Sequence, residues 1–411
     1  MQCSGDTYVE RLPSRLSKAA KIAQDVCSFT SRMITKSRYA VKSLSRNGQW
    51  GSNSTVSEGP CGRDSSPPLR SGYYPALIIL TLLFYSQIPV QAQLAPKTIH
   101  LRGDVRNVHD PTLIKEGNTY YLYSTRAGIA VRCSEDLVLW RLCGDVFGHL
   151  PQWAVEDVKG LRGLWAPDVS YFNGKYHLYY SASTFGSNRS SIGLTTNQTL
   201  DPTSARFRWE DQGKVLGSSS TDDWNAIDPH LVLDEQRQPW LSFGSFWSGI
   251  KLRRIDPATG KPSTQDQTLY SLASRLRTPE LPGAIEAPAI ILKNGYYYLF
   301  VSFDLCCRGV NSTYNIRVGR SRRVTGPYTD RSGKSMMEGG GTLILAGDGR
   351  WRGPGHCSVL QDKGGDFIVY HAYDAEARGI PTLRISPLIW DLDGWPRPIT
   401  IEAHARLTTI P

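Results

Sequence analysis

The sequence predicts an all-β fold, a five-bladed β-propeller, and three observations lead to that prediction. An aromatic-rich segment of strand character recurs five times between Asn118 and Tyr373. Each copy lies between a shorter apolar run and a second β-like run, so at least three strands recur in every unit. Each unit is about 60 residues long, a length that suits one four-stranded propeller blade.

The strands follow one another in the same order in every unit. The runs that open the units are DPTLIKEG, APDVSYFNG, DPHLVLDE, APAIILKNG and HCSVLQDKG. The aromatic segments come after turns rich in Gly, Asn or Asp, and they read NTYYLYSTRA, GKYHLYYSAST, RQPWLSFGSF, NGYYYLFVSF and GDFIVYHAY. The third runs are GIAVRCS, SIGLTTN, GIKLRRID, NIRVGRS and TLRISPL. We expect a fourth strand in each unit. The alternative, a β-sandwich, would not require five matching units.

The opening run of each unit carries the candidate catalytic residues. Aligning these runs on their prolines gives four residues the same position, immediately before the proline: Asp110, Ala166, Asp228 and Ala287. The fifth unit lacks the proline and has His356 there, while Glu286 lies one residue earlier in its own unit. The first strand of every propeller blade lines the central channel, so equivalent positions converge on one axis. We therefore expect these acids and His356 to meet in space.

Converging carboxylates indicate chemistry or cation binding. They repel one another, and burial raises the pKa of at least one of them. A pair of carboxylates suits glycosidic cleavage, since a protonated one donates to the leaving oxygen while an ionised one activates water or attacks the sugar. A third carboxylate can keep the pKa values of the pair apart. The simpler alternative is that Asp-Pro merely opens a turn or a strand, but that reading does not explain three acids in register in different units.

Aromatic side chains near the same end of the channel are candidates for sugar binding. Trp165 stands next to Ala166, and Phe185 lies in the segment STFGSN. His109, the neighbour of Asp110, is a third candidate for contact with the substrate. Sugar rings stack on exposed aromatic rings, although a single aromatic residue can equally belong to the core.

A series of motifs resembles one family of enzymes. In chain order these motifs are HDPT, LWAPDVSY, STFGSN, AIDPH, LSFGSFWSGIKL, IEAP, FVSFDLCCRG, GPGH and LRISPLIWDLDGWP, between residues 104 and 398. They resemble the five-bladed propeller glycoside hydrolases of family 43, and among these the endo-1,5-α-L-arabinanases. The resemblance implies inverting endo-hydrolysis of α-1,5-linked arabinofuranosyl bonds in pectic arabinan. The alternatives are an exo-acting α-L-arabinofuranosidase or β-xylosidase of the same fold, and a non-catalytic sugar-binding propeller, which would not need all three acids.

The same resemblance assigns roles to individual residues. It implies that Asp110 is the general base, that Glu286 is the general acid, and that Asp228 tunes the pKa of the acid and orients it. His356, in GPGH, resembles a channel histidine that is associated with a bound metal, usually calcium, mostly through waters. A lone histidine is a weak ligand for a hard cation, which prefers oxygen. No organic cofactor is expected, and the expected partner is the polysaccharide, bound by a monomer without an obligate protein partner.

The N-terminal region looks like a targeting sequence with an unusual extension. The run ALIILTLLFYSQI is too short to span a bilayer comfortably and is followed by small residues, so residues 76–92 resemble a secretory signal and its cleavage site. Residues 1–75 are polar and are expected to be disordered, or to precede the true start of translation. We expect residues 93–411 to form the propeller and to be secreted, beginning near Gln93. The alternative is a type II membrane protein with a signal anchor.

Charge and cysteine content narrow the class further. Residues 1–92 carry 11 Lys and Arg against 5 Asp and Glu, and the remaining residues carry 36 against 32. The body of the chain is thus nearly neutral, and without a clustered basic stripe nucleic-acid binding is not expected. Five cysteines follow residue 92, so at least one is unpaired, and Cys133 with Cys143 is the predicted local disulfide. Three N-x-S/T sequons downstream of residue 92 fit a secreted chain: Asn188, Asn197 and Asn311.

Overall fold

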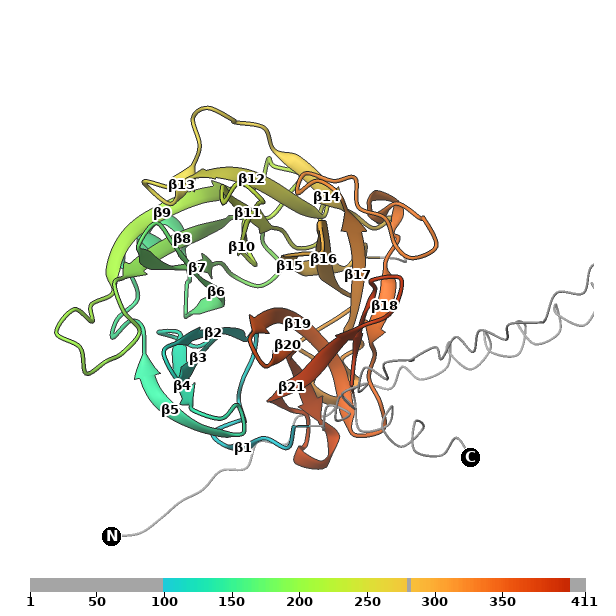
Figure 1. Cartoon of the computed structure of the whole chain (residues 1–411). Helices are drawn as coiled ribbons and strands as arrows, with labels where there is room; N and C mark the ends of the chain where they lie inside the picture. Colours follow the sequence, from blue (N-terminus) through green and yellow to red (C-terminus); the bar gives the residue numbers. More distant parts are fainter. Residues whose placement is uncertain (1–98, 279–281, 400–411) are drawn as a thin grey trace, which may run out of the picture. The chain divides into compact units, whose positions relative to one another are not determined.

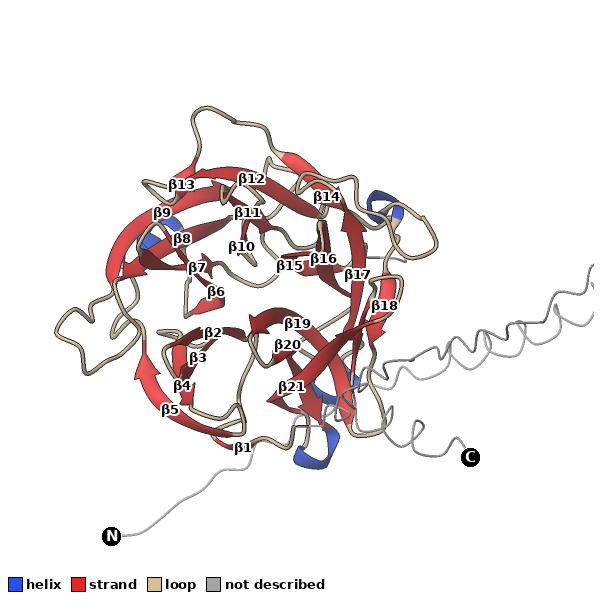
Figure 2. Ribbon diagram, viewed as in Figure 1, coloured by secondary structure: helices blue, strands red, loops and turns tan. Residues whose placement is uncertain are grey.

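Five β-sheets surround one axis in the computed structural model, which describes residues 99–278 and 282–399 (Figure 1). The described chain is mostly strand, with short helices in the connections (Figure 2). The five-bladed β-propeller predicted from the repeats is therefore confirmed. The predicted extension and signal segment, residues 1–75 and 76–92, lie outside the described residues. Within residues 99–278 and 282–399, no helix is long and apolar enough to cross a membrane.

Each blade contains the three strands visible in the sequence and the expected fourth. Blade 1 comprises β2 (Thr112–Glu116), β3 (Thr119–Ser124), β4 (Ala130–Ser134) and β5 (Leu139–Asp145). Blade 2 comprises β6 (Leu164–Phe172), β7 (Lys175–Ala182), β8 (Ser190–Asn197) and β9 (Glu210–Ser218). Blade 3 comprises β10 (His230–Leu233), β11 (Pro239–Phe243), β12 (Ile250–Asp256), β13 (Lys261–Pro262) and β14 (Tyr270–Ala273).

Blades 4 and 5 complete the ring. Blade 4 comprises β15 (Ile285–Lys293), β16 (Tyr296–Phe303), β17 (Asn315–Ser321) and β18 (Thr342–Leu345). Blade 5 comprises β19 (Trp351–Asp362), β20 (Gly365–Asp374), β21 (Ile380–Trp390) and β22 (Pro396–Pro398). The helices of the described chain lie between strands: α2 (Gln152–Asp157), η1 (Gly309–Asn311), η2 (Met336–Glu338) and η3 (Ala375–Ala377).

The hydrophobic core lies between the blades. Five apolar clusters are formed by the described residues, and each one joins two neighbouring blades. The cluster of Leu122 in blade 1 with Val369 and Leu383 in blade 5 joins the ends of the ring. Strands with apolar neighbours on both faces are buried along their whole length, as β8 is. Blade-to-blade packing therefore holds the inner strands, and their side chains, in fixed positions around the channel.

The N-terminal segment ties the first blade to the last. β1 (Arg102–Gly103) pairs with β5 at the outer edge of blade 1. The chain then crosses to β21 of blade 5, where the Val105 carbonyl accepts a hydrogen bond of 2.8 Å from Leu383 N–H. Val108 N–H donates to the Pro381 carbonyl at 3.2 Å. This pairing, together with the apolar cluster beneath it, closes the ring.

The position that the prolines align has an unusual backbone in all five blades. Its φ angles are positive, between 46° and 58°, at Asp110, Ala166, Asp228, Ala287 and His356. A non-glycine residue rarely adopts this left-handed conformation, and it persists only where the surroundings impose it. The five residues thus form a ring of equivalent, strained positions around the channel.

A hydrogen bond from the preceding blade holds most of these strained positions. Alignment of the second strands gives one equivalent residue in or directly after each of them: Thr125, Ser181, Gly244, Ser302 and His371. Four of them accept the N–H of the strained residue in the next blade, as Ser181 Oγ accepts Asp228 N–H at 2.9 Å. Gly244 has no side chain to offer. The corresponding N–H, that of Ala287, donates instead to Asp228 Oδ2 at 3.1 Å.

The cysteines and sequons can now be placed. Cys133 and Cys143 form the predicted disulfide, which joins β4 to β5. The adjacent residues Cys306 and Cys307 form a second disulfide, and Cys357 is the unpaired, buried cysteine of the described chain. Two of the three sequons correct our expectation, because Asn188 and Asn197 are buried. Of the three, Asn311 is exposed and remains the candidate for glycosylation.

Candidate active site

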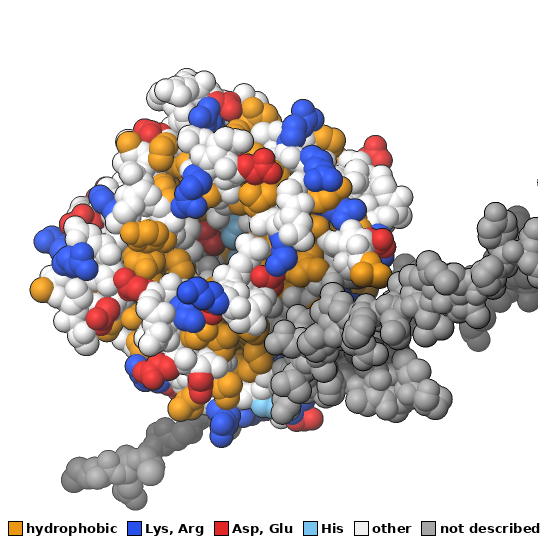
Figure 3. All heavy atoms as spheres, in the orientation of Figure 1, with side chains coloured by type: hydrophobic (Ala, Val, Ile, Leu, Met, Phe, Trp, Pro, Cys, Tyr) orange, Lys and Arg blue, Asp and Glu red, His pale blue; other side chains and the backbone are white. Residues whose placement is uncertain are grey.

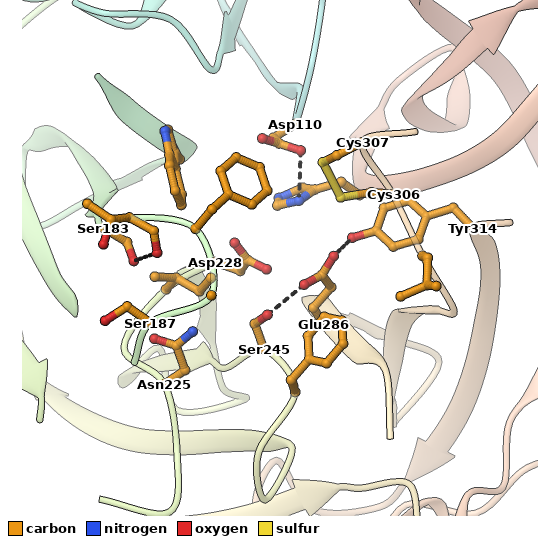
Figure 4. A pocket seen from close by; sticks show the side chains of 18 of the residues that line it. Asp110, Ser183, Ser187, Asn225, Asp228, Ser245, Glu286, Cys306, Cys307 and Tyr314 are labelled. Atoms are coloured by element: carbon orange, nitrogen blue, oxygen red, sulfur yellow. Dashed lines mark hydrogen bonds and ion pairs between the residues drawn. A yellow bond between two sulfur atoms is a disulfide. The ribbon is translucent and has the colours of Figure 1, made fainter. Parts of the chain in front are cut away.

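A cavity of about 650 Å³ opens at one end of the channel. Figure 3 shows it as a hollow in the middle of one face, with acidic and histidine side chains visible inside. All the side chains singled out in the sequence line this cavity: Asp110, Asp228, Glu286, His356, His109, Trp165 and Phe185. The acids come from three different blades and point toward one another (Figure 4). The predicted convergence is therefore confirmed.

Asp110 is surrounded by groups that favour its ionised form. Its Oδ1 lies 2.7 Å from Nδ1 of His109 and 3.1 Å from Nδ1 of His356, and its Oδ2 accepts a hydrogen bond of 2.6 Å from the Thr125 hydroxyl. Burial by itself would raise the pKa of this carboxyl. The charges and hydrogen bonds of the two histidines outweigh burial and hold the pKa of Asp110 well below its usual range. Asp110 is thus a carboxylate at neutral pH.

The two histidines of blade 5 differ in charge. Burial works to lower the pKa of His356, but the carboxylate of Asp110, helped by Asp228 and Glu286, raises it to about 9. His356 is therefore a cation at neutral pH. His371 is completely buried, and burial holds its pKa well below the usual value, so it is neutral. Its Nδ1 accepts Asp110 N–H at 3.2 Å, which places the remaining proton on Nε2, a buried atom without a hydrogen-bond partner in the described structure.

The surroundings of Glu286 favour its protonated form, whereas those of Asp110 favour the ionised form. Its Oε2 accepts a hydrogen bond of 2.6 Å from the Ser245 hydroxyl, and its Oε1 accepts one from the Tyr314 hydroxyl (Figure 4). Burial raises the pKa of Glu286, and the nearby charge of Asp228 raises it further. Burial also raises the pKa of Asp228 itself, although His356 opposes this change. The arrangement therefore keeps Glu286 protonated while Asp110 is ionised, which is the combination that a general acid and a general base require.

The aromatic candidates form part of the cavity wall. The rings of Trp165 and Phe185 lie 5.2 Å apart, and Phe185 is 80% exposed, so this pair presents an open surface to a ligand. His109 is less available, because Asp110 takes its Nδ1 and the Tyr373 hydroxyl lies 2.8 Å from its Nε2. His109 can therefore offer a ligand mainly the surface of its ring, while its nitrogens orient Asp110.

Other residues of the cavity were not foreseen. Tyr314 and Ser245 hold Glu286, yet neither was singled out in the sequence: Tyr314 directly precedes the third run of its unit, and Ser245 lies near the end of the aromatic segment RQPWLSFGSF. Phe246 and Trp247 also line the cavity, and both have the strained left-handed backbone, with φ of 54° and 38°. Strain of this kind persists at functional sites because the surroundings impose it. The motif LSFGSFWSG was the available signal for this aromatic pair.

The donor atoms at the channel do not suit direct binding of calcium. Within the described residues, His109, Asp110 and His371 each bring one potential ligand atom within 4.8 Å of the others. Two of these three are imidazole nitrogens, whereas calcium takes six to eight oxygen ligands. Nδ1 of His356 lies against Asp110, and the histidine is already cationic. The calcium expected near His356, held mostly through waters, stays a prediction, and no chemical step here depends on it.

Comparison with known proteins identifies the family of this chain. The sequence profile of the family described as glycosyl hydrolases family 43 matches residues 105–396. An extracellular endo-α-(1→5)-L-arabinanase of Bacillus subtilis is 45% identical over 326 residues, 78% of this chain and 95% of the relative. An extracellular exo-α-(1→5)-L-arabinofuranosidase of Cellvibrio japonicus is also 45% identical, over 299 residues, 71% of this chain and 86% of the relative.

Solved structures give the same picture. An α-L-arabinanase of Cellvibrio cellulosa superposes with a TM-score of 0.69 at 44% identity, covering 72% of this chain and 97% of that protein. A family 43 endo-arabinanase from Bacillus licheniformis superposes with a TM-score of 0.68 at 50% identity, covering 73% and 99%. The similarity thus extends over nearly the whole length of each of these two proteins.

Proposed function

The chain belongs to the glycosyl hydrolases of family 43 and is a glycoside hydrolase, and from that premise we propose that it cleaves α-1,5-linked arabinofuranosyl bonds within pectic arabinan by inversion. The observation that carries the proposal is the opposed state of two carboxyl groups in one cavity. Asp110 is held ionised by histidines, and Glu286 is held protonated by burial and by Asp228. Beside them, Trp165 and Phe185 present a surface on which sugar rings can stack.

Each acid has one task in the proposed mechanism. Asp110 accepts a proton from a water molecule, which attacks the anomeric carbon on the face opposite the leaving oxygen. Glu286 donates its proton to that oxygen as the glycosidic bond breaks. Asp228 keeps Glu286 protonated by its negative charge, and the hydrogen bond from Ala287 N–H fixes the orientation of Asp228. The strained backbone at both aspartates is consistent with carboxylates that are positioned before the substrate binds.

The choice of substrate rests on the named relatives. Proteins named as acting on α-1,5-linked arabinose are 45% identical to this chain, and one solved relative is an arabinanase complexed with arabinohexaose. The second candidate function, exo-acting hydrolysis, is favoured by the Cellvibrio relative, because it matches at the same identity as the endo-acting one. Both functions would use the same three acids. They differ in whether the cleft accepts a chain that continues past both ends.

We also propose that the protein acts outside the cell. Two relatives at 45% identity are named as extracellular enzymes. Secretion would release a chain that begins at or near Gln93. N-terminal sequencing of the secreted protein tests this proposal. Recovery of the protein in the membrane fraction with residues 1–75 intact would favour the type II anchor instead.

Product analysis on linear, debranched arabinan tests the reaction itself. Endo-hydrolysis predicts oligosaccharides of mixed length at early times, together with a rapid loss of viscosity. Release of a single short product would indicate the exo-acting alternative. Proton NMR during the first minutes should show the β anomer at the new reducing end, because inversion converts an α linkage into a β product. If arabinan yields no new reducing ends, or if the first product is the α anomer, the proposal is wrong.

A further inference from the structure

One wall of the cavity contains a disulfide that the proposed mechanism does not use. The loop that follows β16 carries Leu305, Cys306, Cys307 and Arg308, and all four residues line the cavity. The two adjacent cysteines are bonded to each other. Figure 4 shows the disulfide between Asp110 and Tyr314, at the edge of the space that the acids enclose.

The disulfide lies close to both catalytic carboxyls. Sγ of Cys307 is 3.8 Å from Nε2 of His109, and Nδ1 of that histidine lies 2.7 Å from Asp110. On its other side is Tyr314, whose hydroxyl donates to Glu286. Cys306 is half-buried and Cys307 is exposed, so the sulfurs are within reach of a ligand. A sugar that spans the acid and the base would lie against them.

The wall is held in place from several directions. Cys307 N–H donates to the Tyr373 hydroxyl at 2.7 Å, and Cys307 has a left-handed backbone with φ of 63°. The base of the loop is closed by Thr313 N–H, which donates to the Leu305 carbonyl at 2.9 Å. A bond between adjacent residues adds a small covalent ring, which restricts the loop further. A surface that is rigid before binding loses little entropy when a ligand packs on it.

We propose that the Cys306–Cys307 disulfide is a substrate-contacting wall of the sugar subsite between Asp110 and Glu286, and that an arabinofuranose ring packs its carbon face on the two sulfurs. This inference rests on the proposed function. A disulfide has no hydrogen to donate and its sulfurs are weak acceptors, so the contact is one of dispersion and apolar burial. Reduction removes this surface, since the S–S bond is replaced by two separate thiols and the loop loses its covalent ring.

Protection from reduction tests the contact directly. The reductant is tris(2-carboxyethyl)phosphine, which supplies two electrons, becomes the phosphine oxide with oxygen from water, and leaves two thiols. The protein is the full chain with Glu286→Gln, which should bind linear arabino-oligosaccharides without cleaving them. Thiols are alkylated at intervals and counted by peptide mass spectrometry. The Cys133–Cys143 disulfide, in the outer strands of blade 1, is the internal control.

The expected result is selective protection. With oligosaccharide at ten times its Kd, reduction of Cys306–Cys307 should slow by about tenfold, because only the free protein exposes the sulfurs. Reduction of Cys133–Cys143 should keep its rate. Calorimetric binding of the oligosaccharide with unchanged reduction of Cys306–Cys307 would overturn this inference alone. Absence of binding would overturn both the inference and the proposed function.

A kinetic comparison separates contact from general stability. Cys306→Ala with Cys307→Ala should raise KM for arabino-oligosaccharides by about fivefold, the effect of losing about 40 Å² of apolar contact. The kcat should change by less than about twofold, because ground-state and transition-state binding weaken together. Cys133→Ala with Cys143→Ala is the matched control and should leave KM unchanged. An unchanged KM in the Cys306/Cys307 variant would contradict the contact, and the protection assay decides if that variant does not fold.

Discussion

Asp110 and Glu286 are both carboxylic acids at the inner edge of a blade, and each is 8% exposed, yet their surroundings push their pKa values in opposite directions. Burial acts on both in the same sense. The difference comes from the neighbours, since Asp110 meets the imidazoles of His109 and His356, whereas Glu286 meets hydroxyl groups and the negative charge of Asp228.

This contrast teaches how a propeller assigns roles to similar side chains. His356 belongs to blade 5, Asp110 to blade 1, Asp228 to blade 3 and Glu286 to blade 4. Each carboxyl therefore takes its charge state in part from residues of other blades: Asp110 from His356 of blade 5, together with its own neighbour His109, and Glu286 from Asp228 of blade 3. Changing a single neighbour should shift one acid and leave the other in its role. Of the four substitutions below, in order of decreasing effect, the first two remove one acid each and the last two change a neighbour.

Asp110→Ala should have the largest effect. Loss of the base should lower kcat by about 10⁴-fold or more, since proton transfer contributes about 10²–10⁴-fold and positioning of the water adds to it. The loss should be similar on arabinan and on aryl arabinofuranosides with good leaving groups, because both need an activated water. Kinetics on both substrates check this, with circular dichroism as the folding control. Retained activity on either substrate would remove Asp110 from the role of base.

Glu286→Ala should affect arabinan and aryl arabinofuranosides to different extents. On arabinan the kcat should fall by about 10²–10⁴-fold, because the leaving sugar alcohol needs a proton. On aryl arabinofuranosides with good leaving groups, provided that they bind, most of the rate should remain. The ratio of the two kcat values in wild type and variant is the measurement. Equal losses on both substrates would argue that Glu286 does more than donate a proton.

Asp228→Asn should act through Glu286. Removal of the negative charge lowers the pKa of Glu286, and Glu286 is active only while protonated. The basic limb of the pH profile of kcat/KM should therefore move to lower pH, by about one pH unit. The acidic limb, which reports on the ionisation of Asp110, should move less. A basic limb that stays in place would show that Asp228 does not control the acid.

His356→Gln should have the smallest effect at neutral pH. Loss of the cation raises the pKa of Asp110, so the acidic limb of kcat/KM should move to higher pH. At pH 7 most of the Asp110 population should remain ionised, because His109 still lies against it, and kcat should fall by less than about tenfold. An acidic limb that does not move would mean that His109 alone sets the state of Asp110.

The sequence predicted the positions of the acids but only part of their surroundings. Alignment on the prolines succeeds because it marks the left-handed position of each blade, which the fold repeats. Thr125 and His371 occupy another repeated position and could have been found by aligning the second strands as well. Tyr314 could not, because the connection between β16 and β17 that carries it differs in length from those of the other blades. Ser245 lies within the aligned segment, directly after Gly244, but nothing in that position marks it as a partner of Glu286.

The exception at Gly244 illustrates the same limit. Asp228 turns its carboxylate toward Ala287 N–H because the repeated acceptor is missing there. In the sequence, that glycine appears only as one small residue in GSFWSG. The vicinal disulfide is similar, since two adjacent cysteines do not indicate which residues of distant blades they will face.

One hydrogen bond contributes both to the closure of the ring and to the position of the catalytic base. Asp110 N–H is bonded to His371, so a single contact both fastens the first blade to the last and fixes the backbone of the base. The seam between blades 1 and 5 cannot part without displacing Asp110. A protein in which this seam has just begun to open would still contain intact sheets and would look folded to circular dichroism, yet it would already be inactive. The rate of hydrolysis is therefore a more sensitive gauge of this seam than any measure of secondary structure.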